Sequence, residues 1–185
     1  MDRCTWCLKD DDYIKYHDEE WGVPVHDDQR LFEMLILEGA QAGLSWLTIL
    51  KRRQGYRECF DYFDIQKNAN YSDDALEAKL LNPGIIRNRL KVFSVRTNAI
   101  AFLKVQEEFG SFDSYIWAFT KGKTIQNQID DVKALPATSK ISDVMSIDLK
   151  KRGFKFVGST ICYAYMQAIG MVDDHIVTCF KYKNR

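Results

Sequence analysis

Apolar residues in this chain recur with the spacing of an α-helix, whereas the strict alternation typical of a half-buried β-strand is scarce. The clearest example follows Asp27 and Asp28, where Leu31, Met34 and Leu35 fall on one helical face. A chain with this pattern buries its apolar side chains by packing helix against helix. The sequence therefore predicts an all-α protein.

Capping residues, glycines and prolines divide this pattern into separate helices. The predicted helices run from the caps at 10–12 to about 21, then over 27–38, 44–53, 87–108, 111–117, 142–152 and 158–169. We expect Gly39 and Gly153 to end two of them and Ser142 to cap the sixth. Residues 120–141 are predicted to form an irregular connection. A length of 185 residues and a hydrophobic content of 46% suit one domain over 1–185, built as a helical bundle with two lobes.

Composition narrows the class of protein. The chain has no apolar run of 18 residues, so no membrane partner is expected, and its first residues lack the apolar core of a signal peptide. We therefore expect a cytoplasmic protein whose five cysteines are thiols or metal ligands. The formal net charge is zero, which argues against a strongly basic nucleic-acid binder. Basic clusters at 51–53, 87–91, 150–155 and 181–185 can still form one basic face, or can simply be solvated helix faces.

The first quarter of the chain gathers aromatic residues around one carboxylate. Its members are Trp6, Tyr13, Tyr16, Trp21, Trp46 and Glu38. Glu38 stands where the helical pattern requires a core residue, at a helix end where the macrodipole disfavours negative charge. Flat rings with one acceptor group suit a pocket for a flat, polar or cationic ring such as a nucleobase. The alternative is an ordinary aromatic core with Glu38 turned to solvent.

Cysteines and histidines near both ends of the chain suggest a metal site. His175 and Cys179 are one helical turn apart, and Cys4 and His17 are candidates near the other terminus. Together they form a Cys2His2 set typical of a structural zinc site that joins the termini. Two alternatives remain: Cys4 and Cys7 supply both thiolates, or these side chains are merely buried. Three other residues carry no predicted site: Cys59 and Cys162 are expected in the core, and His26 on the surface without a partner.

A third pattern lies at 142–169, where the sequence predicts a helix, a short hairpin and a second helix. Gly153 and Gly158 bracket the hairpin, and Gly158 opens the second helix with N–H groups suited to a phosphate. Lys151, Arg152 and Lys155 add positive charge. This is the form of a helix-hairpin-helix, which anchors a DNA backbone independently of sequence. The alternative is an ordinary pair of helices broken by glycine.

Taken together, these segments resemble the 3-methyladenine DNA glycosylase I family of the helix-hairpin-helix glycosylase superfamily. The resemblance covers nearly the whole chain in the family's order. It is carried by residues 13–24, 37–46, 84–87, 150–162, 174–175 and 179. Long ordered matches of this kind are far more specific than any single short motif.

The resemblance implies an enzyme that flips N3-methyladenine out of double-stranded DNA and hydrolyses its N-glycosidic bond, leaving an abasic site and free 3-methyladenine. It implies that Glu38 reads the base edge while Tyr16 and Trp46 sandwich the base. It also implies that Trp6, Tyr13 and Trp21 complete the pocket wall, and that structural zinc is bound by Cys4, His17, His175 and Cys179. Gly43 and Leu44 would fill the gap that the flipped base leaves in the DNA, with Gln41 as a weaker candidate.

Three further expectations concern the reaction. Asp173 stands two residues before His175, as a catalytic aspartate does in related enzymes, but we interpret it as the N-cap of a last helix. The pocket motifs contain no lysine nucleophile, so we expect a monofunctional glycosylase that acts as a monomer. The alternatives are a damage-binding protein without catalysis and a zinc hydrolase. Four protein ligands on the metal disfavour a hydrolase, because they leave no site for water.

Overall fold

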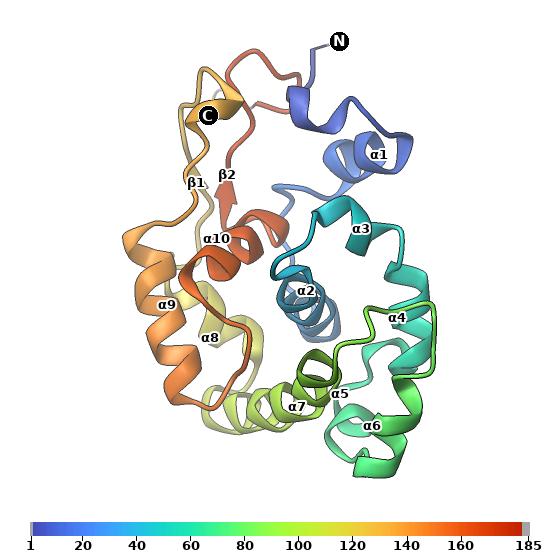
Figure 1. Cartoon of the computed structure of the whole chain (residues 1–185). Helices are drawn as coiled ribbons and strands as arrows, with labels where there is room; N and C mark the ends of the chain where they lie inside the picture. Colours follow the sequence, from blue (N-terminus) through green and yellow to red (C-terminus); the bar gives the residue numbers. More distant parts are fainter. Residues whose placement is uncertain (1, 183–185) are drawn as a thin grey trace.

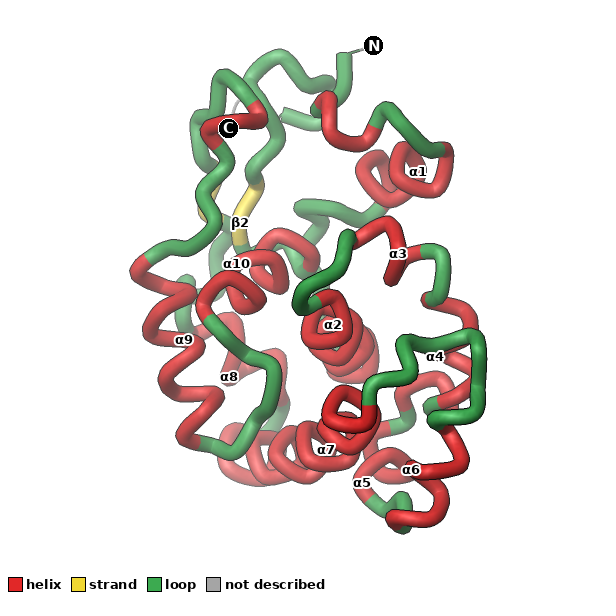
Figure 2. The backbone as a smooth tube through the Cα atoms, in the orientation of Figure 1, coloured by secondary structure: helices red, strands yellow, loops and turns green. Residues whose placement is uncertain are grey.

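The computed structural model describes residues 2–182, and within that range the chain is mostly helical (Figures 1 and 2). The α-helices are α1 Asp11–Glu19, α2 Asp28–Gln41, α3 Trp46–Leu50, α4 Arg53–Cys59, α5 Ile65–Ala69, α6 Asp73–Lys79, α7 Arg89–Phe109, α8 Phe112–Ala118, α9 Lys140–Lys151 and α10 Ser159–Ala168. The 3-10 helices are η1 Thr5–Cys7, η2 Asp61–Phe63 and η3 Val132–Ala134, and the strands are β1 Ile125–Gln126 and β2 Val172–Asp173. The predicted helical class is confirmed. None of the described helices is long and apolar enough to cross a membrane.

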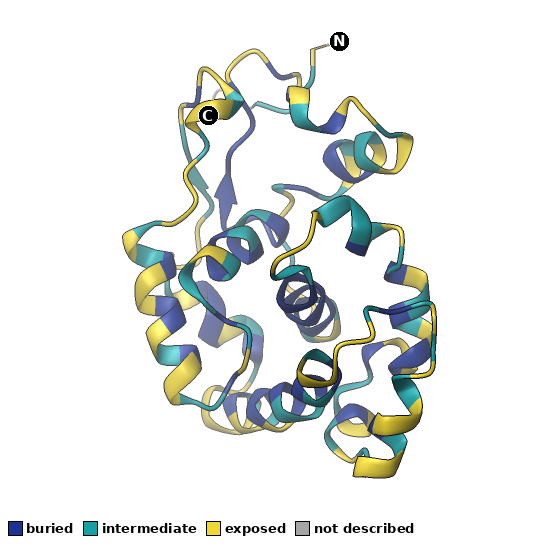
Figure 3. Cartoon of the chain, viewed as in Figure 1, coloured by how far each residue is buried: buried dark blue, intermediate teal, exposed yellow. Residues whose placement is uncertain are grey.

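Helix α2 runs through the middle of the molecule, where α3, α7, α8 and α10 pack around it (Figure 3). It begins at Asp27, whose side chain accepts a hydrogen bond from the backbone of Arg30 at 2.8 Å. Every residue from Leu31 to Ala40 is buried, so the helix has no solvent face over this stretch. Glu38 is therefore placed in the interior by a helix that is surrounded on all sides.

Gly39 does not end α2 as predicted, because its role is close packing rather than helix termination. A Cβ atom built on Gly39 would lie 3.2 Å from the Cβ of Phe156, which belongs to the hairpin between α9 and α10. The helix continues to Gln41, and Gly43 with a φ of +79° turns the chain toward α3. The absent side chain of Gly39 thus lets the central helix and the hairpin touch.

Other predicted boundaries differ from the structure. The helix expected over 44–53 is two helices, α3 and α4, separated by a turn at Lys51 and Arg52. Helix α9 is capped by Ser139, and Ser142 completes a reciprocal capping box at 2.7 and 3.1 Å. The connection 120–141 contains β1, which pairs in parallel with β2. Helices α5 and α6 are absent from the sequence prediction.

The hairpin between α9 and α10 is held from several directions. Asn98 of α7 accepts a hydrogen bond from the backbone N–H of Lys155 at 2.7 Å and donates to its carbonyl at 3.2 Å. Ser146 donates to the carbonyl of Val157 at 2.6 Å, and the side chains of Phe154 and Val157 are buried. The connection between α9 and α10 is therefore tied to both α7 and α9, and Gly158 stands at the start of α10.

Candidate active site

A cavity of about 200 Å³ opens where η1, α1 and α3 face α2 and α10. All six residues of the aromatic and carboxylate group predicted from the sequence line it. The lining residues are Trp6, Tyr13, Tyr16, Trp21, Glu38, Gln41, Trp46, Leu135, Ala164 and Gln167. The cavity thus combines several aromatic rings with one carboxyl group, as a pocket for a flat polar ring requires.

Glu38 reaches the cavity from the last turns of α2, and its side chain is 3% exposed. Its Oε2 atom has no hydrogen-bond partner among the described residues. Burial raises the pKa of this carboxyl group to about 8. An unpartnered buried acceptor of this kind is costly unless a ligand completes it. The alternative in which Glu38 turns to solvent is therefore wrong.

The raised pKa of Glu38 predicts how stability depends on pH. The folded protein binds this proton more tightly than the unfolded chain, so the contribution of Glu38 is most favourable below pH 4.5 and is lost as the pH rises to about 8. In Glu38→Gln that loss is absent, and the variant is expected to gain roughly 3–4 kcal/mol over the parent between pH 5 and pH 8. Urea unfolding of both proteins at the two pH values measures this difference. An equal difference at both pH values would contradict the prediction.

The aromatic rings form one connected group. The ring of Trp6 meets the ring of Tyr13 at 5.1 Å and that of Trp21 at 5.0 Å, both edge to face. Tyr16 and Trp46 lie 5.4 Å apart with their planes tilted by 53°. In this arrangement Tyr16 and Trp46 touch each other, so they form one wall of the cavity rather than a slot. The Nε1 atom of Trp46 is buried without a partner among the described residues.

Sequence reasoning missed three cavity residues. Leu135 follows η3 in the connection that was treated as irregular, and Ala164 and Gln167 lie on α10. Ala164 and Gln167 are three residues apart and share one helical face. Nothing in the sequence distinguishes that face from one that packs in the protein core. Gln41, predicted as a weak candidate for contact with the DNA gap, lines the cavity itself.

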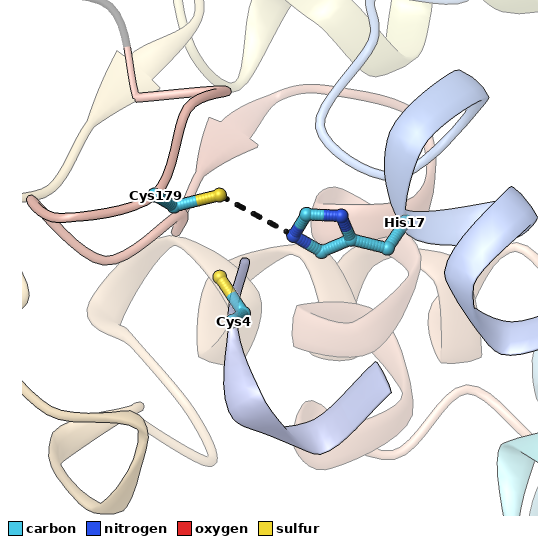
Figure 4. Close-up of side chains that lie close together, drawn as sticks. All are labelled: Cys4, His17 and Cys179. Atoms are coloured by element: carbon cyan, nitrogen blue, oxygen red, sulfur yellow. Dashed lines mark hydrogen bonds between the residues drawn. The ribbon is translucent and has the colours of Figure 1, made fainter. Parts of the chain in front are cut away.

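A second group lies beside the cavity, where the two ends of the chain meet. The Sγ atoms of Cys4 and Cys179 and a ring nitrogen of His17 all lie within 4.8 Å of one another, and all three residues are buried (Figure 4). The Sγ of Cys179 is 3.5 Å from Nε2 of His17. Two ligands of one tetrahedral zinc ion are separated by about this distance when zinc bonds sulfur at about 2.3 Å and nitrogen at about 2.0 Å.

His175 lies next to this group. Its ring centroid is 5.0 Å from that of His17, and its buried Nε2 has no hydrogen-bond partner among the described residues. Its Nδ1 atom lies 2.7 Å from Oδ1 of Asp173, as Nδ1 of His17 lies 2.8 Å from Oδ1 of Asp18. Each imidazole thus has a carboxylate beside its Nδ1 atom. Such a carboxylate commonly orients the ring of a metal-binding histidine. Cys4, His17 and Cys179 thus form a compact group of three, and His175 lies beside it with a free buried nitrogen as the candidate for a fourth ligand.

Two predictions in this group and one elsewhere need correction. No helix follows Asp173 in the described chain, so it caps no helix, and His175 and Cys179 lie in an irregular segment rather than one helical turn apart. Asp173 instead orients His175 and lies outside the lining of the base cavity. Cys7 donates through Sγ to the carbonyl of Cys4 at 3.1 Å, outside the ligand group. His26 is exposed as predicted, but it has partners in Asp113 at 2.7 Å and the ring of Trp117.

The residues predicted to contact DNA surround the cavity or form the hairpin. Gly43 and the exposed Leu44 lie in the turn between α2 and α3, directly between the cavity residues Gln41 and Trp46. Lys151, at the end of α9, and Lys155, on the hairpin, are both exposed. Arg152 is engaged within the protein, because its guanidinium pairs with Asp148 at 2.8 Å and Glu108 at 2.7 Å.

Comparison with known proteins agrees with this geometry. DNA-3-methyladenine glycosylase 1 of Escherichia coli K12 is 46% identical over 98% of this chain and 97% of its own. A crystal structure of 3-methyladenine DNA glycosylase I has a TM-score of 0.96 and 47% identity, over 98% of this chain and 100% of that one. A tyrosine-to-phenylalanine variant of 3-methyladenine DNA glycosylase I in complex with 3-methyladenine has a TM-score of 0.96 and 33% identity over 100% of both chains.

The sequence pattern of a whole family also matches. The model of the methyladenine glycosylase family covers residues 6–182, which include every cavity residue and three of the four candidate metal ligands. The relatives described above are similar over almost their entire lengths. This chain therefore belongs to the methyladenine glycosylase family.

Proposed function

We propose that this chain removes 3-methyladenine from alkylated double-stranded DNA by hydrolysing the N-glycosidic bond, which releases the free base and leaves an abasic site. The observation that carries the proposal is the buried carboxyl group of Glu38 in a cavity walled by aromatic rings. Membership of the methyladenine glycosylase family supports the same reaction. No lysine lines the cavity in the described part of the chain, which favours a monofunctional glycosylase. One chain carries the whole aromatic and carboxylate group, which supports action as a monomer.

The proposed reaction requires few catalytic groups from the protein. Methylation at N3 places a positive charge on the base, so the base is already a good leaving group. Flipping it out of the duplex costs a few kcal/mol, and less for a damaged base. The carboxyl group of Glu38 accepts a hydrogen bond from the base edge, and the positive charge of the base favours its ionised form. The glycosidic electron pair then moves to the base, and water adds to the sugar carbon and loses a proton.

Stacking in this cavity requires a small movement. A base between two rings needs a separation of roughly 7 Å, twice the van der Waals spacing of about 3.5 Å. Tyr16 and Trp46 are 5.4 Å apart, so the proposed sandwich forms when Trp46, at the start of α3, swings away from Tyr16. Stacking is worth about 1–3 kcal/mol per base, which offsets much of the cost of flipping. The cavity then lies between two lobes, with α1 and α3 on one side and α2 and α10 on the other.

We also propose that Cys4, His17, His175 and Cys179 hold a structural zinc ion. The unpartnered Nε2 of His175 and the close approach of the other three side chains support this set. With four protein ligands the ion leaves no position for water, so its role is to fix the fold and not to react. The rings of Trp6 and His17 are 5.5 Å apart, and those of Trp21 and His175 are 4.7 Å apart. The ion would therefore support the aromatic wall of the base cavity.

DNA contact is assigned to the hairpin and to the turn beside the cavity. Lys151, Lys155 and the start of α10 at Gly158 face a phosphate backbone in this proposal. Gly43 and Leu44 occupy the gap left by the flipped base, as apolar wedges do in other proteins that deform DNA.

The proposed hairpin contact predicts a change in salt dependence. Each of Lys151→Ala and Lys155→Ala is expected to reduce the slope of log affinity against log salt by about one, since one phosphate contact is lost. Binding to undamaged duplex at several salt concentrations measures the slope. Lys67→Ala, an exposed lysine on α5, is the control and should keep the slope of the parent. Equal slopes in all four proteins would remove the hairpin from the DNA interface.

The proposed reaction is tested by chromatography of the bases released from methylated duplex DNA. Selective release of 3-methyladenine, with 7-methylguanine left in place, is the expected result. Tight binding to the same DNA without release of any base would instead identify a damage-binding protein.

A further inference from the structure

Gln167 is a cavity residue to which the proposed reaction assigns no role. It lies near the end of α10 and lines the same cavity as Glu38. Its amide nitrogen, Nε2, donates a hydrogen bond to Oδ2 of Asp174 at 2.8 Å. A glutamine amide has a donor end and an acceptor end, so this contact determines which end remains for a ligand.

Asp174 is well suited to fix that orientation. It is 1% exposed and accepts three hydrogen bonds within the protein. Its Oδ1 accepts from Nδ2 of Asn127 at 2.6 Å, and its Oδ2 accepts from the hydroxyl of Tyr163 at 2.7 Å as well as from Gln167. An ionised carboxylate only accepts hydrogen bonds, so rotating the Gln167 amide would bring oxygen against oxygen. A buried carboxylate with three donors holds Gln167 in one orientation.

We propose that Gln167 is a specificity-determining residue whose Oε1 accepts a hydrogen bond from the 6-amino group of the base, and that Asp174 is its positioning residue. This inference rests on the proposed function and deepens it. The 6-amino group of an adenine carries two hydrogens, and Glu38 and Gln167 can each accept one of them from the cavity lining. A base with a carbonyl at position 6 would place its oxygen against Oε1, leaving polar groups unpaired. The pair thus selects 6-amino purines over 6-oxo purines.

The experiment compares the affinities of the full-length protein for two free bases, 3-methyladenine and 3-methylhypoxanthine, which differ at position 6. Quenching of tryptophan fluorescence reports both dissociation constants. Gln167→Met removes the acceptor at similar size. It is expected to weaken binding of 3-methyladenine by roughly tenfold to a hundredfold. Binding of 3-methylhypoxanthine should not weaken and is expected to tighten, because the oxygen that opposes its carbonyl is gone, and this also shows that the cavity is intact.

Two further variants separate positioning from general damage. Asp174→Asn presents an amide that can donate as well as accept, so the Gln167 amide is free to rotate and the preference for 3-methyladenine should fall. Tyr163→Phe removes another hydrogen bond from the same carboxylate without touching Gln167, and it should keep the parent's ratio of dissociation constants.

The inference is overturned if Gln167→Met keeps the parent's ratio, if the parent binds both bases equally, or if Tyr163→Phe shifts the ratio as far as Asp174→Asn does. Base release by the parent from methylated duplex, measured in parallel, tests the proposed reaction separately. A protein that prefers 3-methyladenine through Gln167 but releases no base would retain this inference and lose the proposed reaction.

Discussion

Glu38→Gln is expected to lower the rate of 3-methyladenine excision by roughly a hundredfold to a thousandfold while the fold is kept. Glutamine preserves the size of the side chain but cannot become an anion. It therefore loses the fixed negative charge that stabilises the positive charge passing from the base to the sugar in the transition state, a contribution of about this size when a preorganised group is removed from a dry active site. Single-turnover excision from methylated duplex DNA at saturating enzyme measures the effect.

A control for this variant lies on the same helix. Glu33 is buried in α2 and pairs with Arg53 at 2.7 Å and Arg57 at 2.8 Å, outside the cavity lining. Glu33→Gln should lower stability, because breaking a buried pair costs about 3–5 kcal/mol, yet it should excise at the parent's rate below its melting temperature. We thus expect the substitution of Glu38 to lower the excision rate and the substitution of Glu33 to lower stability. Excision by Glu38→Gln at the parent's rate would refute the role assigned to this carboxyl group.

Loss of the proposed zinc ion is expected to have the largest effect on stability. Cys4→Ser should bind less than one equivalent of zinc and melt at least about 10 °C below the parent, on a scale of roughly 2–4 °C per kcal/mol for a chain of this size. Because Trp6 and Trp21 contact the two histidines of the site, affinity for free 3-methyladenine should fall as well. Metal analysis, thermal unfolding and fluorescence titration measure the three quantities.

The matched control is Cys7→Ser, which changes a buried thiol three residues away in the same 3-10 helix segment. Among residues 2–182 this thiol makes one hydrogen bond, to the carbonyl of Cys4, so the expected loss is about 1 kcal/mol. Treatment of the parent with a chelator should reproduce the melting temperature of Cys4→Ser. If Cys4→Ser retains a full equivalent of zinc and melts with Cys7→Ser, the proposed ligand set is wrong.

Local sequence signals predicted the long helices because caps and apolar spacing act within a few residues. The starts of α2 and α8 are marked by Asp27 and Ser111, whose side chains accept the backbone hydrogen bonds expected of N-caps. Helices α5 and α6 were missed because helices of 5 and 7 residues are too short to show a period. The role of Gly39 was predicted wrongly because the need for a glycine there comes from close contact with Phe156, which is distant in the sequence.

The cavity residues likewise divide into those that local sequence signals predicted and those that depend on the fold. The aromatic group and Glu38 were recognisable because they are concentrated in one stretch and break the expected helical pattern. Leu135 and Gln167 come from segments that are distant in the sequence, and only the folded arrangement of the chain brings them to the cavity. Similarly, Asp173 looked like a helix cap, but its role is set by the fold, which places His175 against it.

The meeting of the two chain ends has a consequence for how the protein is made. The backbone N–H of Phe180 donates to the carbonyl of Asp2 at 2.9 Å, and Lys181 donates to the carbonyl of Asp18 at 2.8 Å. The aromatic wall borne by η1 and α1 is thus held by Phe180 and Lys181, which are synthesised long after it. The wall cannot close until these two residues have left the ribosome, since domains fold as units. A prematurely terminated product would carry the hairpin without a finished cavity, so incomplete synthesis yields no active enzyme.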